Sequence, residues 1–470
     1  MKKCTEVRAN ASKDFYIRPV QLLIMPVEIF AVGGYNEVGK NMTAIKVNNT
    51  MVVCDMGIHI ENYIKLTEDE DLISVSGDDL INAGAAPNIG VIEEQKSLVK
   101  AIIPTHAHLD HVGAIPFLSN NFNATIICTP FTASVINAIL KDERIRIKNP
   151  IKRLNTNSVY NLNQDVKIEF INITHSTPQT VMVALHTPEG IILYANDFKF
   201  DKYPTLGKQP NFNRLQELGR KGILALIVDS TYANEAKKMP SESVAKEMLR
   251  DVMLGTNSKD KMIIATTFSS HLARLKSIIE FGKRLNRKVL FLGRSLSKYV
   301  RAGEEVGIIN FSKDVEIIKY SKQIKKRLRK ISPVKRKKYL LVVTGHQGEP
   351  KSTLSKMVDG KLDFTFNPED HVIFSCNVIP TETNRLNRAL LEKKLRDFGV
   401  RIFKDIHVSG HAAREDLRDL INLVKPKHII PAHGTTAMTS ALSDLAAEMG
   451  YLPEKTVHVT RDGQTIMLEL

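Results

Sequence analysis

Short apolar runs recur along the first half of the chain, separated by turns and polar segments. From Val27 to about residue 232 they read VEIFAVGG, TAIKVN, MVVCDMG, VKAIIPTH and ATIICTP, and then VKIEFINIT, GIILYAN and ILALIVDS. Runs of this length, rich in β-branched residues and bounded by turn signals, predict buried strands. The alternation of these strands with turns and helices predicts an α/β layered fold.

A second series of alternating elements follows. Helices are predicted at 241–254 and 271–285, and strands at 261–268, 288–293, 339–345 and 371–378. A helix at 383–399 and a strand at 401–410 are then expected to lead the chain back to the first domain. A chain of 470 residues exceeds the roughly 250–300 residues at which single cores stop growing. We therefore expect an N-terminal extension at 1–24, a first domain at 25–232, an inserted domain at 233–380 and a return segment at 381–470.

Three histidines and one aspartate fall within six residues, directly after the predicted strand that ends at Ile103. In the string HAHLDH these are His106, His108, Asp110 and His111. The first pair shares one face by the period-two rule, and the second pair lies on the turn behind it. The alternative is a set of solvated loop histidines, but a cluster of this density marks a metal or catalytic site. The string therefore predicts a metal-dependent hydrolase.

Further metal ligands stand at the carboxyl ends of other predicted strands. His175 follows VKIEFINIT, Asp197 follows GIILYAN, and His433 follows HIIPA. Each alone would be an ordinary polar residue at a strand end. Imidazole-rich sites with carboxylates suit zinc best and tolerate manganese, so we expect two divalent ions, zinc in first place.

The formal net charge is +15, and the excess is concentrated in one segment. Residues 322–338, KQIKKRLRKISPVKRKK, hold ten basic residues and no acidic one. A phosphate-rich partner would be drawn to this run. We expect Lys335, Arg336, Lys337 and Lys338 to contact the sugar–phosphate backbone of RNA. The alternative is a solvated, partly disordered loop that only maintains solubility.

Cysteine and apolar content indicate where the protein resides. Its four cysteines are widely spaced and include no C-x-x-C pair, which is typical of a reduced, cytosolic chain. No apolar run approaches the roughly 20 residues that span a membrane, and the N-terminus lacks a signal-peptide pattern. We expect a cytoplasmic protein with no membrane partner.

The order of these residues resembles the metallo-β-lactamase superfamily. Asp55, in VVCDMG, matches its first motif. Asp229, in LIVDSTYAN, matches the acidic motif that opens the β-CASP region. His411, in SGHAARED, and PAHG, around His433, look like the last two β-CASP motifs. VVTGHQGEPKSTLSKM resembles the RNase J family in particular. Because the sequence stops at the final predicted strand TIMLEL, we expect the shorter archaeal form of that family. The resemblance implies an αββα sandwich with an inserted α/β β-CASP domain.

The metal roles follow from these matches. His106, His108 and His175 would hold one ion, Asp110, His111 and His433 the other, and Asp197 would bridge them, so that a bound water is activated as the nucleophile. The catalytic group would comprise Asp55, Asp110, Asp229 and His411. Within it, Asp55 and Asp229 would orient ligands, and protonated His411 would neutralise charge or protonate the leaving oxygen. The alternative for His411 is an ordinary loop histidine.

Loops of the predicted inserted domain carry small and polar residues at strand ends, where backbone N–H groups can form an anion nest. Most such loops are simple turns, but their likeness to RNase J implies a seat for the 5′-monophosphate of RNA. The expected phosphate contacts are Ser269, Ser270, Gly345, His346, Gln347, Gly348, Ser375, Asn377, His407, Ser409, Gly410 and His411.

The resemblance implies a ribonuclease that degrades RNA 5′→3′ from a monophosphorylated end, with some endonuclease action, in RNA decay and maturation, and a homodimer. A β-CASP endonuclease acting internally on RNA or DNA is the first alternative. A small-molecule hydrolase is disfavoured by the insertion and the basic run. A non-catalytic RNA-binding protein would need a missing ligand, and the sequence has them all.

Overall fold

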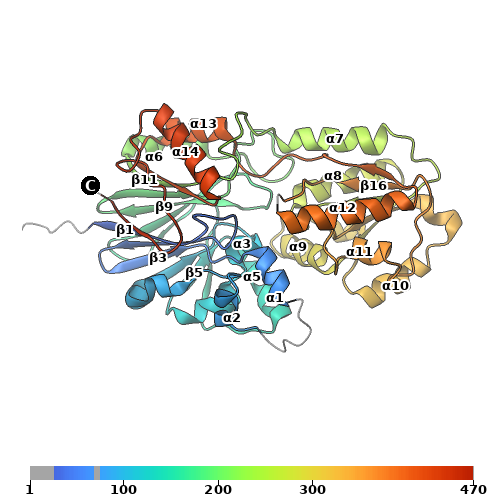
Figure 1. The fold of residues 1–470 in the computed structure, drawn as a ribbon, viewed down its shortest axis with the longest axis horizontal. Coiled ribbons are helices and arrows are strands. Elements are labelled where there is room, and N and C mark those ends of the chain that lie inside the picture. The colour runs from blue at the N-terminus through green and yellow to red at the C-terminus, as the bar shows by residue number, and fades with distance from the viewer. Residues whose placement is uncertain (1–25, 68–74, 380, 469–470) are drawn as a thin grey trace, which may run out of the picture.

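The computed structural model describes residues 26–67, 75–379 and 381–468, so the predicted extension at 1–24 lies outside the described residues. Two bodies lie side by side along the longest axis (Figure 1). One holds the first and last parts of the chain, and the other holds the middle part. The insertion predicted from the sequence is thus visible in the course of the chain.

The first body is built on two stacked sheets. The seven-stranded sheet runs in the order β19 (Thr465–Leu468), β1 (Val27–Gly33), β2 (Met42–Val47), β3 (Thr50–Cys54), β4 (Val99–Ile103), β5 (Thr125–Cys128), β6 (Ile151–Arg153). The six-stranded sheet runs in the order β18 (Pro426–Ala432), β11 (Ile223–Asp229), β10 (Gly190–Ala195), β9 (Val181–Thr187), β8 (Lys167–Asn172), β7 (Val159–Asn161). Apolar side chains from both sheets form one core between them, including Ile29, Val52, Phe170 and Ile192.

Helices cover the outer face of each sheet. On the seven-stranded side lie α1 (Ile60–Thr67), α2 (Gly77–Asn82), α3 (Leu109–Val112), α4 (Ile115–Leu118) and α5 (Pro130–Glu143). On the six-stranded side, α6 (Phe212–Lys221), α13 (Arg414–Val424) and α14 (Thr436–Glu448) bury their leucines against the sheet. This is the predicted αββα sandwich.

The inserted body is a third, wholly parallel sheet with helices on both faces. Its order is β14 (Val315–Ile318), β13 (Lys288–Leu292), β15 (Tyr339–Val343), β12 (Ile263–Thr266), β16 (His371–Phe374), β17 (Arg401–Phe403). The helices are α7 (Glu242–Leu254), α8 (Leu272–Arg284), α9 (Arg294–Glu305), α10 (Ser321–Arg329), α11 (Thr353–Val358) and α12 (Glu382–Asp397). Strands covered on both faces read as continuous apolar runs, which is why KMIIATTF and YLLVVTG were recognisable in the sequence.

The end of the inserted domain lies further along the chain than the predicted boundary at residue 380. Strand β17 pairs in parallel with β16, and Leu391 and Leu395 of α12 pack in the same core as Phe374. The elements expected in the return segment therefore belong to the third sheet. The sequence could not show this, because a helix and a strand after an insertion fit either domain by period alone. The chain returns to the first domain only after Phe403.

The basic run at 322–338 forms a helix followed by a short turn. It is not the solvated, partly disordered loop considered as the alternative. Residues 321–329 form α10, which buries Ile324 and Leu328, and η4 (Pro333–Lys338) leads into β15. Arg336 pairs with Asp370 and Lys337 with Asp260. Because η4 precedes β15, it lies at the amino edge of the parallel sheet, opposite the edge where the loops after the strands gather.

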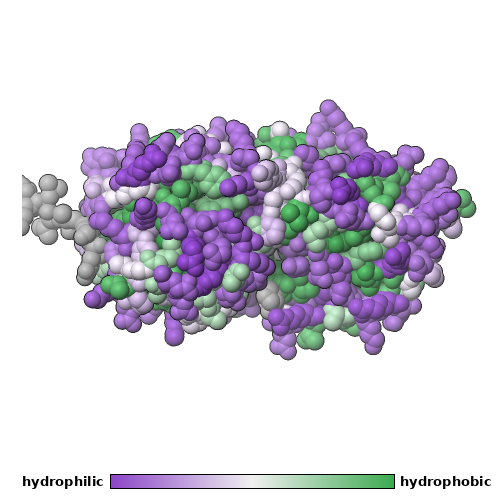
Figure 2. Space-filling model, turned by 90° about the horizontal axis from the view of Figure 1, so that it is seen from above, coloured by the Kyte–Doolittle hydropathy of each residue, from purple (hydrophilic) through white to green (hydrophobic). Residues whose placement is uncertain are grey.

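Viewed from the side of α13, α14 and α7, the surface is largely hydrophilic, with hydrophobic residues in separate patches (Figure 2). Within the described ranges, no helix combines the length and the apolar character needed to cross a bilayer.

Candidate metal centre

The first predicted ligand group comes together at the carboxyl ends of β4, β8 and β10. Nδ1 of His108 lies 3.0 Å from Nε2 of His106 and 3.1 Å from Nε2 of His175. Oδ2 of Asp197 lies 3.6 Å from His106 Nε2 and 3.5 Å from His175 Nε2. Four ligand atoms from three strand ends thus face one point.

The second group shares Asp197 with the first. Nε2 of His111 lies 3.3 Å from Asp197 Oδ2 and 3.6 Å from Asp110 Oδ2. Nε2 of His433 lies 3.5 Å from Asp197 Oδ1 and 3.8 Å from Asp110 Oδ2. All seven predicted ligands therefore meet in two adjacent groups, with Asp197 between them.

The donor set fits divalent ions. Oδ1 of Asp197 is buried and has no hydrogen-bond partner among the residues that the structure describes. Imidazole nitrogens that converge at 3.0–3.1 Å with a carboxylate beside them can share a cation. Nitrogen-rich groups of three imidazoles and one carboxylate are the donor chemistry of zinc.

Burial and neighbouring charge tune these imidazoles. Burial lowers the pKa of His106 and His175 well below its usual value and lowers that of His108 to about 4, so these rings are neutral and can coordinate. Burial also acts to lower the pKa of His111, but the carboxylates of Asp197, Asp55 and Asp110 outweigh it and raise this pKa well above the usual value. The field that favours a proton there equally favours a metal cation.

Asp55 is hydrogen-bonded to a residue of the second ligand group. Its Oδ2 accepts from His111 Nδ1 at 2.8 Å and from the Tyr194 hydroxyl at 3.0 Å. Its Oδ1 accepts from the backbone N–H of Thr105 at 2.7 Å. Asp55 and His433 both have positive φ, 61° and 50°, which side-chain-bearing residues rarely adopt. Such backbone strain gathers at functional sites, where the surrounding structure holds it.

Two residues that orient ligands were not found from the sequence. Asn41 Oδ1 lies 2.7 Å from Nδ1 of His433, and the carbonyl of Gly410 accepts from Nδ1 of His175 at 2.8 Å. A Cβ on Gly410 would lie 2.9 Å from the His175 ring. A lone asparagine 392 positions from its partner gives no local signal, and Gly410 was assigned to a phosphate instead.

His411 stands at the rim of the two groups. Its Nδ1 donates to Asp229 Oδ2 at 2.8 Å, and its Nε2 lies 3.9 Å from Asp197 Oδ2. Oδ1 of Asp229 accepts from the backbone N–H of Thr231 at 2.8 Å. Burial acts to lower the pKa of His411, but Asp197 and Asp229 raise it to about 9. The His411 ring is thus fixed by Asp229 and favours its protonated form.

The predicted phosphate loops do meet at the carboxyl edge of the third sheet, which faces the metal groups. Ser270 Oγ lies 3.1 Å from Nε2 of His108, so the loop after β12 reaches a predicted ligand. Ser269 bonds Ser295 at 3.0 Å. The rings of Phe268 and His346 are 4.2 Å apart.

Several expected phosphate donors are occupied by protein partners. The Gln347 side chain donates to Asn377 O and accepts from Ile379 N, both at 2.9 Å. The buried Ser375 hydroxyl donates to Ile406 O at 2.9 Å and accepts from Arg274 at 2.9 Å.

His407, another expected donor, lies 3.5 Å from Arg274, and burial lowers its pKa to about 2. The N–H of Gly348 donates to Gly345 O at 3.2 Å. Asn377 is exposed, and Ser409 accepts from His411 N at 3.2 Å. Gln347 and Ser375 therefore hydrogen-bond the loops to one another. Among the expected phosphate contacts, His346, Asn377 and Ser409 remain candidates for binding a phosphate.

Three family models match the chain. Residues 77–215 match the metallo-beta-lactamase superfamily, residues 260–392 match the beta-CASP domain of ribonuclease J, and residues 400–459 match the Zn-dependent metallo-hydrolase RNA specificity domain. The class defined by fold and site is thus a β-CASP member of the metallo-β-lactamase superfamily.

Curated relatives narrow the class to one family. Ribonuclease J of Methanocaldococcus jannaschii is 40% identical over 446 residues, which cover 95% of this chain and 99% of the relative. Ribonuclease J of Pyrococcus abyssi is 41% identical over 94% of this chain and 97% of its own length. Ribonuclease J 1 of Streptococcus pyogenes is 30% identical over 94% of this chain and 74% of its own length. The chain belongs to the ribonuclease J family.

A solved structure shares the fold. It is a protein of unknown function from Enterococcus faecalis V583, with a TM-score of 0.63 and 15% identity, matched over 94% of this chain and all of that one.

Proposed function

We propose that this protein is a two-metal ribonuclease that degrades RNA 5′→3′ from a monophosphorylated end. The observation that carries the proposal is the pair of ligand groups sharing Asp197, whose Oδ1 is buried and unbonded within the described chain. Membership of the ribonuclease J family supports RNA as the substrate. The convergence of the candidate ligand atoms in two groups disfavours a non-catalytic RNA-binding role.

His106, His108, His175 and Asp197 would hold one ion, and Asp110, His111, His433 and Asp197 the other. When bound, the ions supply Lewis-acid polarisation of the phosphate and of the attacking water. Zinc suits these groups best, and manganese suits the more oxygen-rich second group.

His411 supplies the proton in this mechanism. Asp229 fixes its Nδ1 hydrogen, so the proton at Nε2 is the one directed toward the metal groups. A pKa raised to about 9 keeps that proton in place at neutral pH. From Nε2 it can pass to the leaving oxygen of the cleaved phosphodiester.

The loops at the carboxyl edge of the third sheet support an end-directed mode. One of them, the loop after β12, reaches the first ligand group, where Ser270 Oγ lies 3.1 Å from His108 Nε2. We assign the 5′-phosphate to His346, Asn377 and Ser409, which lie in the loops after β15, β16 and β17. A triphosphate brings more charge than these few donors can satisfy.

A digest of 5′-end-labelled RNA tests the mode of action. Release of labelled mononucleotide from the first time point is expected. Labelled intermediates of scattered length would contradict it and would favour the alternative, an endonuclease acting internally. The same digest after chelation and after adding back zinc or manganese identifies the active metal.

We further propose a cytoplasmic homodimer. The described cysteines Cys54, Cys128 and Cys376 are free and buried, which is consistent with a reducing compartment. Light scattering coupled to gel filtration would test the dimer, for which a monomer mass is the contrary result.

A further inference from the structure

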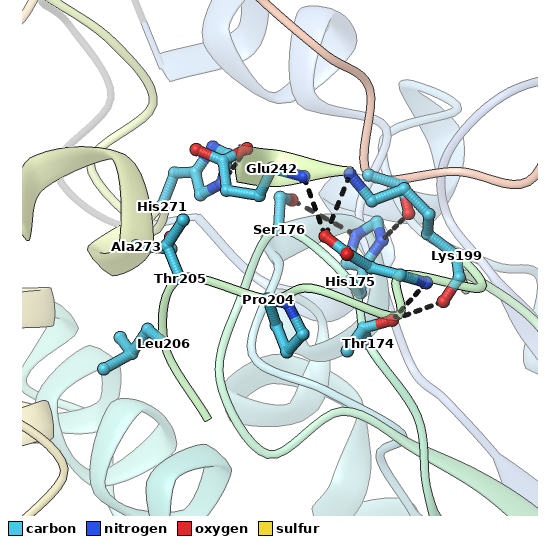
Figure 3. A pocket seen from close by; sticks show the side chains of 12 residues that line it. Thr174, His175, Ser176, Lys199, Pro204, Thr205, Leu206, Glu242, His271 and Ala273 are labelled. Carbon is cyan, nitrogen blue, oxygen red and sulfur yellow. Dashed lines mark hydrogen bonds and ion pairs between the residues drawn. The ribbon is translucent and has the colours of Figure 1, made fainter. Parts of the chain in front are cut away.

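Strand β10 and the residues after it reach both candidate ligand groups. On the side of the first group, Thr174 and Lys199 lie beside His175 in the wall of a pocket (Figure 3). The N–H of Lys199 donates to Thr174 O at 2.7 Å, and the N–H of Asp201 donates to the Thr174 hydroxyl at 3.1 Å. These bonds hold the segment after β10 against the residue that precedes His175.

On the side of the second group, β10 supplies a buried side chain instead. Tyr194 is 1% exposed and packs in the core between the two sheets. Its hydroxyl donates to Asp55 Oδ2 at 3.0 Å and accepts from Asn196 Nδ2 at 2.9 Å. The same Oδ2 of Asp55 lies 2.8 Å from Nδ1 of His111. Tyr194 thus contacts the hydrogen-bond partner of a candidate metal ligand.

The chemistry of these groups fixes where each hydrogen points. An ionised carboxylate only accepts, so the Tyr194 hydroxyl and Nδ1 of His111 both donate to Asp55. The phenol has a single hydrogen, so its oxygen is free to accept from Asn196. With Nδ1 committed to Asp55, His111 directs its other nitrogen toward Asp197 Oδ2, 3.3 Å away. Nε2 is therefore the nitrogen left for an ion.

The two oxygens of Asp55 are held in different ways. Oδ1 accepts from the backbone N–H and the hydroxyl of Thr105, at 2.7 and 2.9 Å. Oδ2, which faces His111, accepts from Tyr194 and more distantly from the Thr105 hydroxyl at 3.2 Å. Asp55 follows β3 of one sheet and Tyr194 lies on β10 of the other, so this bond spans the core. Because Asp55 is fully buried, losing that donor leaves Oδ2 poorly satisfied.

We propose that Tyr194 is a positioning residue for the second ligand group. Its hydroxyl holds Asp55 Oδ2 in line with His111 and so raises the affinity of this group for its ion. The assignment rests on the proposed two-metal function and deepens it. Partners that orient a ligating imidazole are worth about 10–100-fold in metal affinity. Tyr194 acts one hydrogen bond further from the ion, so its share should be smaller, about three- to tenfold.

Zinc binding to the metal-free chain tests this role, with a competing chelator to give the dissociation constant of each step. Asp110→Ala identifies the step of the second group, because Asp110 belongs to that group alone. Tyr194→Phe should weaken that step about three- to tenfold and leave the first step unchanged. Tyr35→Phe is the matched control, since its hydroxyl is buried in the same core but bonds Thr43 at 2.6 Å. Both steps should stay unchanged in this control.

Two further measurements separate positioning from general stability. Both tyrosine variants should lower the Tm of the metal-free protein by similar amounts, since each loses one buried hydroxyl. Only Tyr194→Phe should change the affinity for zinc. When Asp55→Ala is already present, Tyr194→Phe should cause no additional loss of zinc affinity, because its effect passes through Asp55.

The possible results separate the two proposals. Unchanged or tighter zinc binding at the second step in Tyr194→Phe, or an equal loss in Tyr35→Phe, would overturn the role of Tyr194. So would an undiminished effect of Tyr194→Phe in the Asp55→Ala background. Binding of a single zinc equivalent by the unmodified chain would overturn the two-metal function and this assignment with it. If Asp55→Ala does not fold, the comparison of Tyr194→Phe with Tyr35→Phe decides.

Discussion

The two edges that face each other at the domain junction are built differently. On the first domain, Asp55 and Asn41 hydrogen-bond the outward ring nitrogens of His111 and His433, while the inward ligand atoms and the Asp197 carboxylate converge in two groups. On the inserted domain, Gln347 and Ser375 are bonded to their own neighbours. The edge of the first domain directs its ligand atoms toward two points that can take cations. The polar side chains at the edge of the inserted domain mainly stabilise the loops of that domain. Substitutions at the edge of the first domain should therefore lower the rate of RNA cleavage more than substitutions at the edge of the inserted domain.

Removing one ligand should give the largest effect. His108→Ala deletes the nitrogen that lies within 3.1 Å of both His106 and His175, so metal content and activity should both be lost. Elemental analysis and an RNA digest measure the two. Retention of two metal equivalents with full activity would mean that the first edge is not the metal site.

Removing the proton carrier should give the next largest effect. His411→Ala should keep the metal and lower kcat by roughly 10²–10⁴-fold, the usual worth of a general acid. His186→Ala is the control, because His186 pairs with Glu169 near the end of β9 remote from the metal groups; kcat should stay unchanged. Metal loss in His411→Ala would instead make His411 a ligand.

The inserted edge should affect substrate choice rather than chemistry. RNA with a 5′-monophosphate should be degraded roughly tenfold faster than the same RNA with a triphosphate, and Ser409→Ala should narrow the difference in initial rates. Equal rates on both ends in the unmodified enzyme would remove the end-sensing role from these loops.

The inserted domain should also lose stability in acid through His371. This buried ring has no hydrogen-bond partner on either nitrogen within the described residues. Burial, then Arg401 and Arg287, lower its pKa to about 4. The unfolded state takes up a proton near pH 6.5, but the folded state does so only near pH 4. Stability should therefore fall as pH drops through this window, and His371→Phe should show a smaller drop in Tm between pH 7 and pH 5. An equal drop would assign the acid sensitivity to other groups.

The smallest effect should come from the basic run, at the amino edge of the third sheet. Lys335 and Lys338 have no ion pair within the described residues, whereas Arg336 and Lys337 do. If both free lysines contact phosphates, Lys335→Gln with Lys338→Gln should flatten the salt dependence of RNA binding by about 0.7 per lysine in log–log slope. An unaltered slope would favour a purely solvated role.

The metal centre was predictable because its residues stand directly after strands. His175, Asp197 and His433 each follow a recognisable apolar run, and the ends of parallel strands meet at one edge of a sheet. The αββα sandwich followed from the same runs together with the family resemblance. Strand β9, by contrast, was not foreseen, although it joins β8 to β10.

The remaining details depend on contacts that no local pattern encodes. Whether Ser375 meets a phosphate or Arg274 is decided by packing between β16 and α8, and its sequence context is the same in both cases. The position of β17 is likewise set by pairing with β16. Asn41 is an ordinary polar residue until the fold places it beside His433.

The carbonyl of Gly410 has a thermodynamic consequence beyond orienting one ring. It lies in the segment that connects β17 of the inserted domain to the first domain, and it accepts a hydrogen bond from His175 of the first ligand group. A rotation of the inserted domain that moves the segment after β17 also moves the Gly410 carbonyl away from His175, a candidate metal ligand. Domain orientation and metal affinity then form one linked cycle, in which the factor by which closure tightens the ion equals the factor by which the ion favours closure.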